Sequence, residues 1–179
     1  MAQAKRRKRF FDVDIPIIKK ETQLVGYELK DLEGRIVKYD LTRMLKGKGA
    51  LIQLEVKVKD SKAVAVPMGL KLLPYFLKRV IRKGTNYVED SFTMETKNSR
   101  VEVKPLLVTR RKVSRAVRKA LREKCREELV AYSKDKTSED ILGEILDNRL
   151  QKILSLRLKK IYPLSLCEIR RFKVVKDKQ

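Results

Sequence analysis

Residues 50–58, Ala-Leu-Ile-Gln-Leu-Glu-Val-Lys-Val, carry the clearest structural pattern in the chain. From Ile52 onward apolar and polar side chains alternate, which is the period of a β-strand with one buried face. We therefore predict a strand over Ala50–Val58 in which Ile52, Leu54 and Val56 point into a core. A strand with one apolar and one polar face is typical of an antiparallel sheet.

Strand-like segments lie on both sides of this one. The apolar segment Phe10–Ile18 contains Pro16, which favours an edge strand or an extended entry into the sheet. Pro105 likewise favours an edge position for the segment around it. A short helix is predicted from Pro74 to about Lys83. Further strands are predicted over residues 24–30, 35–41, 63–66, 85–96 and 100–108.

The sequence after Thr109 changes to helical periodicity. A second long helix is predicted from Thr137 or Ser138 to just before Pro163, and a final strand over Leu164–Val175. The whole pattern predicts an α+β fold, with a mainly antiparallel sheet followed by two long amphipathic helices and a C-terminal strand. The apolar stripe of the first helix consists of Val113, Ala116, Val117, Ala120, Leu121, Cys125 and Leu129.

The charge of the chain is strongly unbalanced. Its 179 residues include 45 Lys and Arg but only 23 Asp and Glu, which gives a formal net charge of +22. Such a surplus repels itself and favours a polyanionic partner, of which nucleic acid is the commonest.

The length favours one domain, which we place at residues 10–175, between a disordered basic arm at 1–9 and a charged tail at 176–179.

Residues suited to catalysis are scarce. The absence of His excludes Ser-His-Asp and Cys-His catalytic groups and zinc sites with His ligands. Cys125 and Cys167 lack a metal-binding spacing, and the acids form no paired-carboxylate site. We therefore expect no enzymatic activity, no metal and no cofactor.

The two isolated thiols favour a reducing compartment. Cys125 falls on the apolar stripe of the first helix and is expected to be buried and structural. No apolar run approaches the roughly 20 residues of a membrane span, and no suitable apolar stretch follows the basic N-terminus to make a signal peptide. We expect a soluble intracellular protein without a membrane partner.

A row of cations on the first helix is the strongest indication of function. Its arginines from 111 to 122 recur about once per helical turn, and the only acid between Arg110 and Arg126 is Glu123. Like charges at this spacing destabilise a helix, whereas a planar guanidinium suits phosphate. We interpret the row as a phosphate-binding face rather than a solvated one. It consists of Arg110, Arg111, Lys112, Arg115, Arg118, Lys119 and Arg122.

Two further basic segments are candidates for RNA contact. The N-terminal arm could follow phosphates, but a solvated terminus or a nuclear-import signal also explains its charge. The loop Lys46-Gly47-Lys48-Gly49 is expected to be flexible; it lacks the pattern of a nucleotide-binding loop, and an ordinary turn explains it nearly as well. The candidate cations here are Lys5, Arg6, Arg7, Lys8, Arg9, Lys46 and Lys48.

The aromatic residues give no support for base recognition. The six Tyr and five Phe form no RNA-binding sheet motif, so we expect them in the core. Recognition of the RNA backbone and shape is favoured instead.

Four short segments, in this order, resemble a known family. They are Arg-Phe-Phe-Asp-Val at 9–13, Leu-Glu-Gly-Arg-Ile at 32–36 before Asp-Leu at 40–41, Val-Thr-Arg-Arg-Lys-Val at 108–113, and Ile-Tyr-Pro-Leu at 161–164 before Ile-Arg-Arg-Phe-Lys-Val at 169–174. Together they are similar to the e-type S-one ribosomal proteins, also called the S-three-A family, of archaeal and eukaryotic small subunits. The resemblance covers nearly the whole chain.

The resemblance implies a structural ribosomal protein of the cytoplasm without enzymatic activity. Family members lie on the platform of the small subunit, near the 3′ end of its rRNA and the mRNA exit. The implied partners are small-subunit rRNA, neighbouring ribosomal proteins and mRNA near the exit, and the implied fold is a barrel-like sheet with packed helices. The family's basic features map onto the arm Lys5–Arg9, onto Arg35, and onto Arg110, Arg111, Lys112, Arg115 and Arg118. Eukaryotic members extend beyond the last strand, so a chain ending at Gln179 resembles the short archaeal form.

Two alternatives stay open from the residues alone. An architectural DNA-binding protein of chromatin would explain the charge equally well. An RNA-processing enzyme is less well supported, because the chain has neither His nor paired carboxylates.

Overall fold

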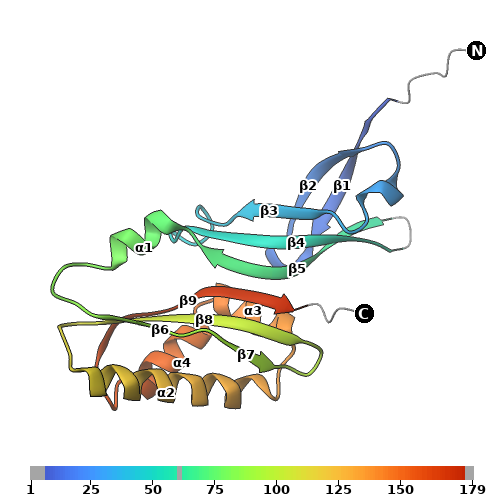
Figure 1. Cartoon of the computed structure of the whole chain (residues 1–179). Helices are drawn as coiled ribbons and strands as arrows, with labels where there is room; N and C mark the ends of the chain where they lie inside the picture. Colours follow the sequence, from blue (N-terminus) through green and yellow to red (C-terminus); the bar gives the residue numbers. More distant parts are fainter. Residues whose placement is uncertain (1–6, 60–61, 176–179) are drawn as a thin grey trace, which may run out of the picture. The chain divides into compact units, whose positions relative to one another are not determined.

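The computed structural model describes residues 7–59 and 62–175 (Figure 1). Its strands are β1 (Arg9–Ile15), β2 (Lys20–Gly26), β3 (Ile36–Asp40), β4 (Ala50–Lys59), β5 (Lys62–Leu72), β6 (Tyr87–Glu89), β7 (Phe92–Glu95), β8 (Arg100–Thr109) and β9 (Leu164–Val175). Its helices are α1 (Pro74–Val80), α2 (Arg115–Ser133), α3 (Ser138–Leu146) and α4 (Arg149–Leu158), with short 3₁₀ turns at Pro16–Ile18 and Leu29–Leu32. The predicted α+β class is confirmed.

Backbone hydrogen bonds connect the nine strands of the described residues into one mixed sheet. The main order is β2-β1-β5-β9-β8-β6, with β3 beside β4, β4 beside β5, and β7 beside β8. Most of these pairs are antiparallel, as predicted, but β1 and β5 run parallel. The sheet is open rather than closed, because β2 and β6 end the order without pairing with each other.

The described residues pack as two compact units. Unit 1 comprises residues within 1–39 and 52–68, and unit 2 comprises residues within 40–51 and 69–179, so β4 and β5 contribute to both. In unit 2 the strands β6 to β9 form one layer, against which α2, α3 and α4 pack (Figure 1). A single domain over 10–175 stays a prediction.

The alternation of β4 is confirmed. Ile52, Leu54 and Val56 are fully buried, whereas Gln53 and Glu55 between them are partly exposed. Each buried aliphatic side chain of this size contributes about 2 kcal/mol. This burial fixes which face of β4 lies inward, since a slip of one residue would reverse it.

The edge position predicted from Pro105 is wrong. Strand β8 lies between β9 on one side and β6 and β7 on the other. Pro105 is tolerated there for two reasons. On the β9 side, the register shifts between Lys104 and Pro105. On the other side, Pro105 lies opposite the gap between β6, which ends at Glu89, and β7, which begins at Phe92. A missing N–H therefore interrupts no regular ladder at this point.

The second long helix of the prediction is two helices. It begins as expected, with Thr137 accepting a hydrogen bond from Asp140 N, but α3 ends at Leu146. Asn148 has a left-handed backbone with φ of 59°, a conformation that Asn tolerates better than most residues. Gln151 Nε2 donates to the carbonyl oxygen of Ile145 at 2.9 Å, which gives a hydrogen-bond donor to a carbonyl in the last turn of α3.

Helix α2 begins later than the sequence suggested. Ser114 is the N-cap and accepts a hydrogen bond from Val117 N, so residues 110–113 precede the helix. Of the predicted stripe, Leu121, Cys125 and Leu129 are fully buried and form the inward stripe, one turn apart. Ala116 is exposed, Val117 and Ala120 are only partly buried, and Val113 precedes the helix. The stripe packs on β6, β7 and α4.

Replacing Leu121 by Asp should destabilise the fold by roughly 4 kcal/mol or more, because it buries an unpaired carboxylate in the α2 stripe. Urea unfolding followed by circular dichroism measures the loss. The matched control is Arg122→Asp, which places the same charge at the next, exposed position. Equal stability of the two variants would mean that the stripe is wrongly assigned.

Both thiols should resist alkylation in the folded protein. Cys125 and Cys167 are free and buried. Burial, with a smaller contribution from the Asp90 carboxylate, raises the pKa of the Cys125 thiol to about 12, and burial also raises the pKa of Cys167. Since the thiolate is the reactive form, iodoacetamide at pH 8 should label neither residue until urea unfolds the chain. Rapid labelling of the native protein, detected by mass spectrometry, would contradict this.

Candidate nucleic-acid interface

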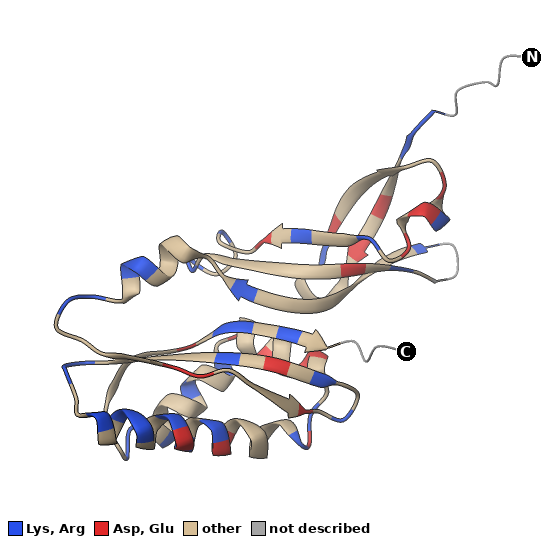
Figure 2. Cartoon of the chain, in the orientation of Figure 1, with Lys and Arg blue, Asp and Glu red and all other residues tan. Residues whose placement is uncertain are grey.

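The inward stripe of α2 determines which of its side chains face outward. Arg115, Lys119 and Arg122 are exposed, and Arg118 is partly buried. Figure 2 shows that Lys and Arg dominate the first half of α2 and the loop before it, whereas acids appear in later turns. The predicted row of cations is therefore a surface, although Arg110, Arg111 and Lys112 belong to the loop rather than to the helix.

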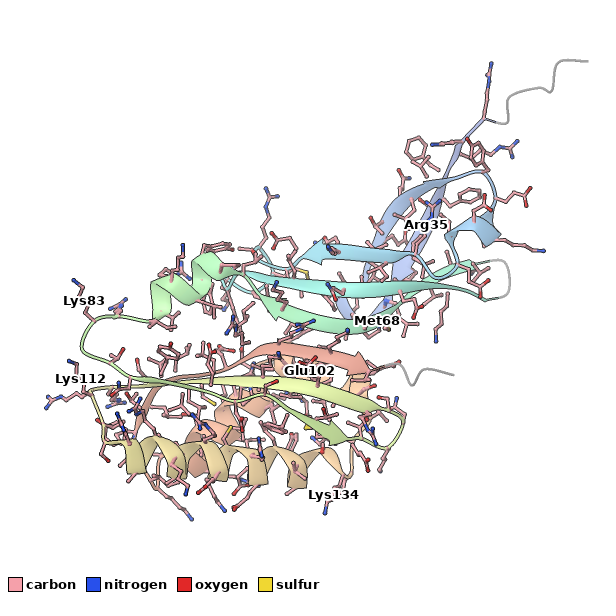
Figure 3. The ribbon with its side chains drawn as sticks, viewed as in Figure 1. Arg35, Met68, Lys83, Glu102, Lys112 and Lys134 are labelled. Carbon is pink, nitrogen blue, oxygen red and sulfur yellow. The ribbon has the colours of Figure 1, made fainter. Side chains whose placement is uncertain are left out.

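Asn86 joins the loop before β6 to the loop before α2. Its backbone N–H donates to Thr109 Oγ1 at 3.0 Å, and its carbonyl oxygen accepts from Thr109 N at 2.9 Å. Its side-chain Oδ1 accepts from Val113 N at 2.8 Å. These bonds bring Arg82 and Lys83 to the same end of unit 2 as the loop of residues 110–113, and Figure 3 shows Lys83 and Lys112 both extending outward there.

Arg82 and Lys83 were not predicted as site residues. The sequence marks them only as the end of a helix before Gly84, because their neighbours in space are more than twenty residues away in the chain. We define the α2 basic face as these two residues together with the predicted row. Its members are Arg82, Lys83, Arg110, Arg111, Lys112, Arg115, Arg118, Lys119 and Arg122.

The face contains a pocket of about 260 Å³. Arg118 Nε is buried beside it and has no hydrogen-bond partner among the described residues. The tyrosine that lines the pocket, Tyr87, is about half exposed. No acid is among the residues that line it, which are Tyr87, Val88, Arg115, Arg118, Lys119 and Arg122. Guanidinium donors around a concave surface suit an anion such as phosphate.

The cations of α2 differ between its two halves. In the second half, Arg126 pairs with Asp90 at 3.1 Å, and Lys124 pairs with Glu127 and Glu128. In the first half, the described residues offer only one ion pair, between Lys119 and Glu123 at 3.7 Å, and both side chains are exposed. Exposed pairs of this kind contribute little.

The dipole of α2 increases the difference between its two halves. The N-terminus of a helix carries partial positive charge, so cations in the first turn are unfavourable there. Helix α2 has no acid in that turn and begins with Arg115. A solvated face balanced by ion pairs therefore describes the second half of α2 but not the first. The first half is suited to an external anion.

The remaining predicted cations lie in several places. In unit 1, Arg7, Lys8 and Arg9 are exposed, and Arg9 is the first residue of β1. Arg35 is exposed and its Nη1 donates to the carbonyl oxygen of Val25 at 2.8 Å. Lys5 and Arg6 lie outside the described residues.

The loop Lys46-Gly47-Lys48-Gly49 is held in place rather than flexible. Lys48 Nζ lies 2.5 Å from Glu168 Oε2 and 2.9 Å from Asn148 Oδ1, and its side chain is only 11% exposed. Gly49 lies against the Tyr75 ring, and a Cβ there would meet the Tyr75 hydroxyl at 2.3 Å, so a larger residue would displace that side chain. Lys46 is exposed, but Lys48 is occupied by an internal ion pair and does not belong to a surface site.

The aromatic residues also depart from expectation. Phe10, Tyr27, Tyr75 and Tyr87 are exposed rather than in the core.

The described residues also offer no metal site, because no group of three or more Cys, Asp or Glu side chains among them could hold a metal ion. No helix in residues 7–59 and 62–175 is both long and apolar enough to cross a membrane.

Fold and surface together define a basic α+β protein in which the start of α2 and the loop before it carry a row of cations with few acids beside them, which is a pattern of nucleic-acid-binding proteins. The Ribosomal S3Ae family matches residues 3–178 of the chain. The chain therefore belongs to the Ribosomal S3Ae family.

Curated relatives agree with this assignment. The chain is 28% identical over 176 residues to small ribosomal subunit protein eS1 of Nanoarchaeum equitans, covering 93% of this chain and 88% of that protein. It is 30% identical over 140 residues to small ribosomal subunit protein eS1 of Pyrobaculum aerophilum, covering 77% of this chain and 63% of that protein. The predicted resemblance is confirmed, and the chain is a structural ribosomal protein rather than an enzyme.

Proposed function

We propose that this chain is an eS1 protein of the small subunit that binds rRNA through phosphate contacts made by the α2 basic face. The observation that carries the proposal is that the first half of α2 has a single, exposed ion pair among the described residues, in contrast to its paired second half. By neutralising neighbouring phosphates, the face stabilises an RNA junction that otherwise repels itself.

The pocket at Arg118 provides the central contact. The guanidinium of Arg118 lines the pocket that receives one phosphate, and the exposed guanidinium groups of Arg115 and Arg122 hold the flanking phosphates. Arg115 and Arg122 are seven residues apart, which corresponds to about 10 Å along the helix. The loop cations beside them, joined through Asn86, extend the same surface.

Unit 1 makes a second set of contacts through the N-terminal arm and Arg35. We propose that both sets lie on the platform of the small subunit, near the mRNA exit and next to other ribosomal proteins, in cytoplasmic ribosomes, and membership of the Ribosomal S3Ae family supports this. Lys46 stays a candidate for phosphate contact, whereas Lys48 does not. The architectural DNA-binding alternative explains the charge but not the membership of a ribosomal protein family.

Reversing Arg111, Arg115 and Arg122 to Glu should weaken binding to small-subunit rRNA about 100-fold, because three charge-assisted contacts are lost. The salt dependence should become shallower by about three units of slope. Filter binding to transcribed rRNA, repeated at several salt concentrations, measures both. The fold should persist, because all three side chains are exposed and Glu at position 115 suits the start of a helix.

The control triple is Lys134→Glu, Lys152→Glu and Lys159→Glu. All three residues are exposed, and the net charge falls from +22 to +16 in both triples. The control should retain most of its affinity. Equal losses in the two triples would show that net charge alone drives binding, and the proposed face would be wrong.

A further inference from the structure

The outer face of the β1–β2 hairpin presents large apolar side chains to solvent. Phe10 is directly opposite Val25 in the antiparallel register, so the two side chains share a face. Phe10 is 72% exposed, Val25 39% and Tyr27 47%. On the other face of β1, Val13 and Ile15 are fully buried. The core is therefore supplied by the other face of β1, and the ring of Phe10 points to solvent without contributing to that core.

Cations surround this apolar surface. Lys8 Nζ lies 5.7 Å from the centre of the Tyr27 ring, within the range of a cation–π contact. Arg35 lies against the backbone of β2 through its hydrogen bond to Val25 O (Figure 3). We define the hairpin patch as Lys8, Phe10, Val25, Tyr27 and Arg35.

The charge of the hairpin changes along its length. Beyond Phe10 the outward side chains are acidic or amide, with Asp12 opposite Gln23 and Asp14 opposite Glu21. Gln23 Nε2 donates to Asp12 Oδ1 at 3.0 Å. An anionic partner is therefore repelled at that end. At the other end Lys8 and Arg35 attract it, although the segment after Tyr27 also carries the exposed acids Glu28, Asp31 and Glu33, of which Glu28 and Asp31 cap the 3₁₀ turn. The exposed rings of Phe10 and Tyr27 lie at the end that carries Lys8.

We propose that the hairpin patch binds a single-stranded segment of RNA, with an unpaired base stacked on Phe10 and flanking phosphates held by Lys8 and Arg35. An exposed ring beside cations complements the two features of every nucleotide, a flat base and a phosphate. A duplex offers the phosphates but keeps its bases stacked inside. The proposal rests on the proposed RNA binding but concerns unit 1, whereas the α2 basic face belongs to unit 2.

The chain contains no Trp, so Phe10→Trp introduces a single fluorescent reporter at the patch. The full-length variant is titrated with a 12-nucleotide single-stranded oligouridylate and with an RNA duplex carrying the same number of phosphates. The single strand should quench the indole saturably, at a concentration at least about tenfold lower than the duplex requires. Leu156→Trp is the control, since Leu156 is 69% exposed on α4 and lies in unit 2.

Equal quenching by single strand and duplex, or equal responses of the two Trp variants, would overturn the proposal. Phe10→Leu keeps an apolar side chain without a ring and should weaken oligouridylate binding about tenfold, and unchanged affinity would also overturn it. If no RNA quenches Phe10→Trp, while Phe10→Ala loses its association with small subunits, the patch contacts a protein instead.

One combined variant tests the hairpin patch independently of the α2 basic face. Phe10→Trp combined with the α2 triple Arg111→Glu, Arg115→Glu and Arg122→Glu should lose affinity for structured rRNA yet keep the indole quenching by oligouridylate. Loss of quenching in this combined variant would show that the hairpin patch does not bind by itself, and would overturn the proposal without affecting the evidence for the α2 basic face.

Discussion

Burial of one stripe of α2 is the constraint on which the rest of the surface depends. Leu121, Cys125 and Leu129 can leave water only by packing on β6, β7 and α4. That packing fixes the rotation of the helix, and the cations of its first half are then forced outward together. Among the described residues their one ion pair is the exposed contact between Lys119 and Glu123, so an external polyanion would relieve most of their mutual repulsion.

The basic end of unit 2 is assembled from segments that are distant in the chain. Asn86 bonds to Thr109 and Val113, so the loop after α1 and the loop before α2 become one structure. Ser114 then caps the helix and sets where its positively polarised end begins. The result is a cationic surface positioned by buried packing and backbone hydrogen bonds, which is what phosphate recognition without base reading requires.

Local patterns predicted the elements that depend on local physics. The alternation in β4, the later part of the α2 stripe from Leu121 to Leu129 and the buried Cys125 follow from periodicity alone, whereas the earlier part of the predicted stripe is not buried. The errors have non-local causes. Pro105 lies inside the sheet rather than at its edge because the register with β9 shifts beside it. Lys48 is largely buried rather than at the surface because it pairs with Glu168, 120 residues away. Arg82 was missed for the same reason, since the bonds of Asn86 to Thr109 and Val113, which join its loop to the loop before α2, span more than twenty residues. Composition likewise could not show that Phe10 faces solvent, because apolar residues are usually buried.

The central claim is that the first half of α2 faces rRNA in the assembled small subunit. Since both native thiols are buried, Lys119→Cys provides a single accessible thiol for an iron chelate that cleaves nearby RNA by hydroxyl radicals. In reconstituted small subunits we expect discrete rRNA cuts from position 119 and weak or no cuts from the same probe at Lys134→Cys, beyond the far end of α2 (Figure 3). Absence of cuts from position 119, or equal cutting from both positions, would contradict the account.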